Sequence, residues 1–163
     1  MPKHNKKRGK YFESKIADII RREFEAHKDH VHRNADSGNA DFEYGDIFVK
    51  DREWIIECKY WSNINYSRLL TDWENLTKDF FAQVDKDADT FRKKHNKEPL
   101  VTVVIASPYV EPIATMRLQN FYNNDMFKTD KKVWELFKVF AINKELLIVN
   151  FQELVKVLKE VSS

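Results

Sequence analysis

Hydrophobic positions change their period several times along the first part of the chain. Over residues 10 to 27 they recur every three or four residues, which predicts an amphipathic helix. Its apolar face consists of Phe12, Ile16, Ile19, Ile20 and Phe24. A short strand is predicted over 30–33, and the polar residues of 34–41 predict a loop. Two apolar triplets, 47–49 and 54–56, flank a polar tetrapeptide and predict two antiparallel strands joined by a tight turn.

The middle of the chain predicts a helix followed by a buried strand. Apolar residues share one face of a helix over 71–94. Residues 100–106 form a continuous apolar run, which is typical of a strand that is buried on both faces. A helix that connects this strand to the one ending near residue 59 predicts a right-handed crossover between parallel strands.

The last third of the chain is less regular. We predict a helix over 113–122, either a strand or a helix over 133–142, and a strand over 146–149. Asn150 then caps a final helix, because Glu153 stands at the capping-box position and apolar residues follow on one face. The complete order predicts an α/β fold, a mixed sheet with helices on both sides.

Length and composition agree with one globular domain over residues 1–163. Hydrophobic residues make up 42% of the 163-residue chain, which is enough for a sizeable core. The single cysteine excludes an internal disulfide. No apolar run approaches the roughly 20 residues that a membrane span needs. We therefore expect a cytoplasmic protein with no membrane association.

Charge is concentrated locally, because the net charge is only +2. Binding to nucleic acid would therefore rest on local patches. One patch is the segment 1–10, which lacks the apolar residues of a core element and is predicted to be a flexible basic arm. Such an arm would contact phosphates, or it would serve only as a solubilising tail. Its basic residues are Lys3, His4, Lys6, Lys7, Arg8 and Lys10.

The predicted hairpin brings together three side chains that could support catalysis. Asp46 opens the first strand, and Glu57 and Lys59 point the same way at the end of the second, with Cys58 on the other face. Two adjacent carboxylates repel and stay ionised more easily beside a cation. A hard divalent ion held by carboxylates acts on phosphates, so the group predicts metal-assisted phosphodiester hydrolysis. A surface ion pair between Glu57 and Lys59 is the alternative.

Several short motifs follow one another between residues 8 and 106: Arg8-Gly9-Lys10 with Glu13, Arg33, Ser37-Gly38, Gly45-Asp46-Ile47 and Glu57-Cys58-Lys59. Their order and spacing resemble the PD-(D/E)xK nuclease superfamily, and within it the Holliday junction resolvases of the archaeal and phage type. One departure is that Gly45 rather than proline precedes the aspartate, which the family tolerates. The resemblance implies a restriction-endonuclease-like fold with core order αβββαβ, followed by a C-terminal strand and helix.

The resemblance also implies a role for each residue of the site. Asp46 and Glu57, helped by the main-chain carbonyl of Cys58, would hold Mg²⁺, for which Mn²⁺ would substitute. Lys59 would position the attacking water and offset charge on the phosphate. Glu13 would add a third acidic group and a possible metal ligand.

Further positions follow from the same resemblance. Gln83 is a candidate site residue because related nucleases place a glutamine on the helix after the lysine strand; a solvated glutamine is the alternative. Arg33 would contact a DNA phosphate, and Ser37 would lie in a mobile loop over the site. The basic residues Lys6, Lys7, Arg8 and Lys10 would bind DNA.

The predicted substrate is branched DNA. A resolvase cuts two strands of a four-way junction symmetrically, so a twofold homodimer is expected. Two alternatives stay open: a nuclease of another specificity, such as a restriction, nicking or exonuclease enzyme, and a DNA-binding module without catalysis.

Overall fold

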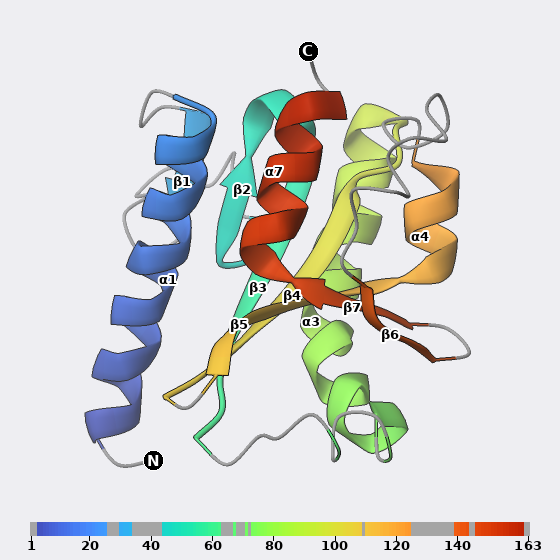
Figure 1. Cartoon of the computed structure of the whole chain (residues 1–163). Helices are drawn as coiled ribbons and strands as arrows, with labels where there is room; N and C mark the ends of the chain where they lie inside the picture. The colour runs from blue at the N-terminus through green and yellow to red at the C-terminus, as the bar shows by residue number, and fades with distance from the viewer. Residues whose placement is uncertain are drawn as a thin grey trace.

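A computed structural model describes residues 3–25, 30–33, 44–62, 67, 71, 73–108, 110–124, 139–143 and 146–161. Their elements lie in a layered α/β arrangement around one mixed sheet (Figure 1). In chain order the elements are α1 (Lys3–Glu23), β1 (Val31–Arg33), β2 (Ile47–Val49), the 3-10 turn η4 (Lys50–Arg52), β3 (Trp54–Tyr60), α3 (Trp73–His95), β4 (Leu100–Ser107), β5 (Val110–Arg117), α4 (Leu118–Asn123), β6 (Val139–Asn143), β7 (Leu146–Asn150) and α7 (Phe151–Val161).

The described strands form a seven-stranded sheet in the order β1-β2-β3-β4-β5-β7-β6. Among the described pairs only β3 and β4 are parallel, and α3 is the crossover between them. The predicted hairpin is confirmed, with Ile47 opposite Ile56 and Val49 opposite Trp54. The predicted α/β class and the core order αβββαβ are therefore confirmed.

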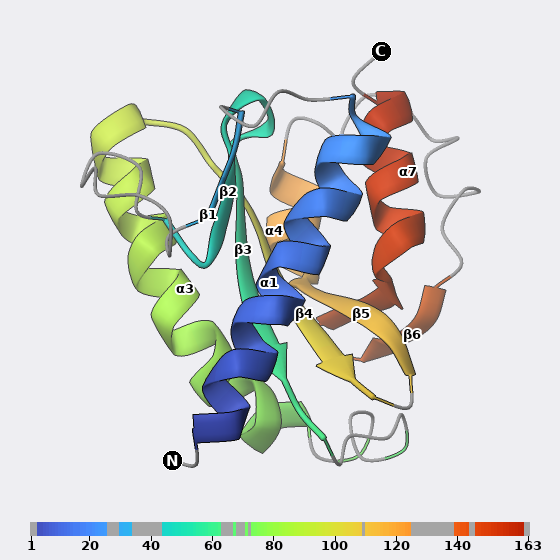
Figure 2. The same cartoon turned by 90° about the vertical axis from the view of Figure 1, so that its left-hand side faces the viewer.

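Helices cover both faces of the sheet. Figure 2 shows α3 on one side, and α1 and α7 on the other. Alternate residues of β3 serve the two cores: Trp54 and Ile56 pack toward α1 and α7, and Ile55 packs toward α3. Continuing this alternation directs Glu57 and Lys59 to the α3 side. Tyr60, like Cys58, packs against the core on the α1 side.

Helix α1 begins earlier than the sequence pattern predicts. It starts at Lys3, so residues 3–10, which we expected to form a flexible arm, are helical. Lysine and arginine favour helices, so this basic segment extends the helix beyond the apolar face that starts at Phe12. Lys7, Arg8 and Lys10 thus project, exposed, from the first turns of α1.

The predicted helix over 113–122 is wrong over its first half, residues 113–117, and correct over 118–122. Strand β5 runs to Arg117, and the helix α4 covers only Leu118–Asn123. β5 lies between β4 and β7 and buries consecutive residues on both faces, so its apolar run carries no strand period. Pro112 precedes the first β5–β7 pair, Ile113 with Asn150, and lies beside a register shift in the β4–β5 ladder, where a missing N–H is tolerated.

The C-terminal elements agree with the sequence. β7 and α7 follow as predicted, and the Asn150 side-chain oxygen accepts the Glu153 backbone N–H at 3.2 Å. Residues 139–143, partly within the ambiguous stretch 133–142, form strand β6, and 133–138 lie outside the described residues. No helix in the described part of the chain combines the length and apolar character that crossing a membrane requires.

Gly45 gives the first testable prediction. Its φ is +63°, and a Cβ there would lie 2.6 Å from the carbonyl oxygen of Ile56. Gly45→Ala should lower the free energy of unfolding by about 1–3 kcal/mol, because the strained backbone and the clash cannot both be relieved. Urea denaturation measures this.

Gly9 offers a matched control, since an added Cβ there meets nothing within 4 Å and the residue lies inside helix α1. Gly9→Ala should stabilise the protein by up to about 1 kcal/mol. Equal effects of the two alanine substitutions would show that the β2 entry does not depend on the left-handed glycine.

Candidate active site

Asp46 is bound to β3 through both its main chain and its side chain. Its N–H donates to the Ile56 carbonyl at 2.9 Å, and its Oδ2 accepts the Cys58 N–H at 2.7 Å. These two bonds hold the aspartate at the entry to β2, beside the part of β3 that carries Glu57. The pairing predicted from the hairpin is thus observed at the level of individual hydrogen bonds.

Glu57 and Lys59 form the ion pair that their spacing predicts. The Lys59 Nζ lies 2.6 Å from the Glu57 Oε1. The glutamate side chain is only 7% exposed and the lysine side chain 33% exposed. A buried carboxylate therefore meets an ammonium that still reaches solvent, which is more than a surface ion pair.

Asp87 of α3 is a member of the group that the sequence interpretation missed. Its Oδ2 accepts the Gly45 N–H at 2.8 Å, so it stabilises the turn that leads into Asp46. Its negative charge also raises the pKa values of Asp46 and Glu57. Asp87 lies one helical turn after Gln83, so helix periodicity alone could have drawn attention to it.

Glu13 joins the same electrostatic group from α1. Its Oε2 lies 3.5 Å from Arg33, whose guanidinium also donates to the Lys10 carbonyl at 3.3 Å. Burial raises the pKa of Glu13, the negative charge of Asp46 raises it further, and Arg33 opposes both. Arg33, which we expected to contact a phosphate, therefore pairs with an acidic candidate of the site.

Burial and neighbouring carboxylates raise the pKa values of Asp46 and Glu57. Burial is the largest cause for Asp46, whose pKa is raised although the Cys58 N–H and Lys59 oppose the change. Burial and then Asp46 raise the pKa of Glu57 from 4.5 to about 7, against the opposing hydrogen bond and charge of Lys59. The folded chain thus confines negative charge that a bound cation would neutralise.

The donor set fits a hard divalent cation that keeps several waters. Two carboxylates, Asp46 and Glu57, and the main-chain carbonyl of Cys58 are oxygen donors of the kind that Mg²⁺ prefers. Over the described residues, no group of three or more histidine, cysteine, aspartate or glutamate side chains is placed to hold a metal ion. Structural zinc sites normally take four nitrogen and sulfur ligands. The Cys58 side chain packs instead against the core on the α1 side.

The remaining predicted residues are not all brought to this place. Gln83 is exposed on α3, and its side chain forms no hydrogen bond with another described residue. Lys7, Arg8 and Lys10 are exposed on α1. Ser37 and the Lys6 side chain lie outside the described residues.

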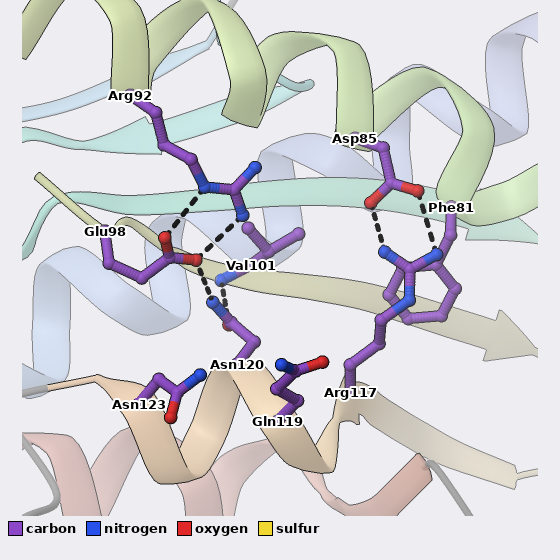
Figure 3. A pocket seen from close by; sticks show the side chains of 9 residues that line it. All are labelled: Phe81, Asp85, Arg92, Glu98, Val101, Arg117, Gln119, Asn120 and Asn123. Carbon is purple, nitrogen blue, oxygen red and sulfur yellow. Dashed lines mark hydrogen bonds and ion pairs between the residues drawn. The ribbon is translucent and has the colours of Figure 1, made fainter. Parts of the chain in front are cut away.

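A separate pocket of about 270 Å³ lies between α3, α4 and the start of β4 (Figure 3). Its charges neutralise one another: Arg92 donates to Glu98 at 2.8 and 2.7 Å, and Arg117 donates to Asp85 through Nη1 and Nη2. The Arg117 guanidinium also lies 4.7 Å from the centroid of the Phe81 ring. The first pair connects α3 to the loop before β4, and the second connects α3 to the end of β5. We therefore interpret the charged residues of this pocket as structural contacts between these elements.

The fold and the site together define the class of protein. A mixed sheet flanked by helices, with an aspartate at the entry to one strand and a Glu-x-Lys on its neighbour, is the arrangement of PD-(D/E)xK nucleases. The model of the family described as "Phage putative PDDEXK endonuclease" matches residues 4–161, so the chain belongs to this family. It is a nuclease of a class that binds DNA and generally uses divalent metals. No curated protein and no solved structure matches the chain.

The raised pKa of Glu57 predicts how stability changes with pH when no metal is bound. The folded state holds the proton more tightly than the unfolded state, whose glutamate has a pKa near 4.5. The resulting stabilisation is complete below pH 4.5 and is lost as the pH rises through about 7. Relative to wild type, Glu57→Gln should therefore gain stability between pH 5 and pH 8, by at most about 3 kcal/mol.

Urea denaturation with a chelator, at pH 5 and at pH 8, measures this difference. The glutamine keeps the size of the side chain and removes the titration. If the free energy of unfolding changed with pH in the same way for both proteins, the raised pKa of Glu57 would be contradicted.

Proposed function

We propose that this nuclease is a metal-dependent, structure-specific DNA endonuclease that hydrolyses phosphodiester bonds at four-way junctions, as Holliday junction resolvases do. The supporting observation is the buried Glu57 carboxylate, 2.6 Å from Lys59 and beside an aspartate that two hydrogen bonds hold in place. The junction specificity rests on the resemblance of the motifs between residues 8 and 106.

Asp46 and Glu57 would hold Mg²⁺ together with the Cys58 carbonyl, and Mn²⁺ would substitute. When bound, the cation supplies electrostatic stabilisation of the charge that develops on the phosphate. The Cys58 N–H binds Oδ2 of Asp46, which leaves Oδ1 available as a donor to the cation. Glu13 adds negative charge to this group, and Arg33 limits that charge.

Lys59 would act on the reacting atoms. An ammonium has three N–H donors, so Lys59 can keep Glu57 and still donate to the attacking water or to a phosphate oxygen. Its partly exposed position allows a substrate to reach it. Positive charge placed there in advance stabilises a pentacoordinate phosphate more than the ground state.

Two symmetric cuts require two sites, so we propose a twofold homodimer. Lys7, Arg8 and Lys10 at the start of α1 would contact phosphates of the junction arms. Their contribution would decrease as the salt concentration rises.

Lys59→Ala tests the proposed chemistry. Cleavage should fall by about 100-fold or more, because a positioned charge is lost from the transition state, while DNA affinity changes only a few-fold. Lys97→Ala is the matched control, since Lys97 forms an ion pair of the same 2.6 Å length with Glu53 on the surface. Wild-type cleavage by Lys59→Ala would remove the lysine from the mechanism.

The substrate is tested with three labelled DNAs in Mg²⁺: a four-way junction, a plain duplex of the same sequence and a single strand. Paired symmetric cuts in the junction alone are the expected result, and Glu57→Gln should abolish them. Equal cutting of the duplex would keep the active site but contradict junction specificity. No cutting of any DNA in Mg²⁺ or Mn²⁺ would contradict the endonuclease proposal.

A further inference from the structure

A groove of about 830 Å³, separate from the pocket between α3 and α4, lies beside the end of β3 on the α1 side of the sheet. It is lined by α1, by the ends of β3 and β4, by the start of β5 and by α7. Its volume falls within the range of roughly 300–1,000 Å³ that small-ligand sites occupy. Tyr60, which follows Lys59 in the chain, is one of its lining residues, so the groove and the carboxylates share one strand end.

The α1 wall of this groove alternates cationic and aromatic side chains. Arg8, Tyr11 and Lys15 are spaced by three and four residues, so they lie along one face of the helix over about 10 Å. All three are exposed, and Tyr11 is 73% exposed. Within the described residues, neither Arg8 nor Lys15 forms an ion pair. On the β5 side, the Glu111 carboxylate accepts the Asn150 amide at 2.8 Å.

This pattern matches the chemistry of an unpaired nucleotide. A tyrosine ring can stack on the face of any base, and flanking cations can bind the adjacent phosphates. A base inside a duplex exposes only its edges, because its faces are covered by its neighbours. The groove therefore suits DNA in which at least one base has left the helix.

The position of the groove relative to the carboxylates connects it to the chemistry. Glu57 and Lys59 are directed to the α3 side of β3, whereas Tyr60 packs on the α1 side. Lys59 and Tyr60 are successive residues of β3, so their side chains leave the same strand end toward opposite faces of the sheet. One DNA strand could lie at the carboxylates while an unpaired strand turns away across this end into the groove.

We propose that this groove binds unpaired nucleotides of a branched DNA next to the cleavage site, with Tyr11 as the stacking surface and Arg8 and Lys15 on the phosphates. This inference rests on the proposed nuclease function and extends its substrates from four-way junctions to branched DNA with unpaired bases beside the branch. The proposal leaves the roles given above to Asp46, Glu57 and Lys59 unchanged.

The test compares two DNAs that share one duplex, one blunt and one with splayed single-stranded arms, bound to the full chain with a chelator present. Wild type should bind the splayed DNA more tightly than the blunt one. Tyr11→Ala should weaken binding to the splayed DNA about tenfold, the loss of one base stack, and leave blunt-duplex affinity within about twofold. Tyr11→Phe keeps the ring and should behave as wild type.

Tyr122→Ala is the matched control, because Tyr122 is also an exposed tyrosine on a helix, 56% exposed, and does not line the groove. A fluorescent adenine analogue at the first unpaired position should be quenched by wild type and not by Tyr11→Ala. Since Tyr11 is exposed, the variant should unfold at the wild-type temperature.

Three results would overturn the inference: equal affinity of wild type for the two DNAs, equal losses on both DNAs for Tyr11→Ala, or the same loss for Tyr122→Ala. The cleavage assay on the junction, the duplex and the single strand tests the proposed function independently of the groove. A wild type that cuts nothing but prefers splayed DNA would contradict only the endonuclease proposal. Normal cutting with no effect of Tyr11→Ala would contradict only the groove.

Discussion

The hydrogen bond between the Cys58 N–H and the Asp46 side chain is the interaction on which the site depends. It fixes the carboxylate of one strand to the main chain of the next, beside the position where Glu57 begins the Glu-x-Lys segment. Gly45 makes this approach possible, because any Cβ at its positive φ would collide with the Ile56 carbonyl. Asp87 accepts the Gly45 N–H, so a residue of α3 stabilises the same turn.

The fixed geometry has an electrostatic cost. Burial raises the pKa values of Glu13, Asp46 and Glu57, and the charge of Asp46 adds to the increase for both glutamates. A protein that only needed stability would gain by replacing one of these groups with a neutral side chain. Their presence together is consistent with a site that gains its full stability only when a cation is bound.

The side chains at the end of β3 differ in chemistry between the two faces of the sheet. Glu57 and Lys59 lie on one face, and the groove beside α1 lies on the other. Toward α3 the strand ends in acidic groups and one ammonium. Toward α1 it ends beside exposed arginine, tyrosine and lysine side chains. Strand alternation alone produces this division, because consecutive side chains at a strand end point to opposite faces. The acidic group and the cationic, aromatic helix face therefore lie on opposite faces of the sheet at the same end of β3.

Local patterns in the sequence predicted the hairpin, the crossover and the paired acidic groups. The triplets around residues 50–53 predicted the hairpin, and the apolar run at 100–106 predicted a strand that is buried on both faces. Asp46 and Glu57 met as expected because a hairpin register follows from its turn. The family resemblance added Glu13, whose distance along the chain from Asp46 no local pattern could bridge.

Interactions between distant segments decided the rest. The residues from Val110 to Arg117 became a strand because β4 and β7 were available to pair with both of its edges, a choice that their own apolar run does not contain. Asp87 entered the site because α3 crosses the sheet next to Gly45, and Arg33 met Glu13 because β1 lies under α1. The sequence by itself thus determined which chemical groups share the β2–β3 hairpin, since a strand pairs with its neighbour by local rules. Only the tertiary structure decided which groups from the helices join them, because those contacts depend on how whole elements pack.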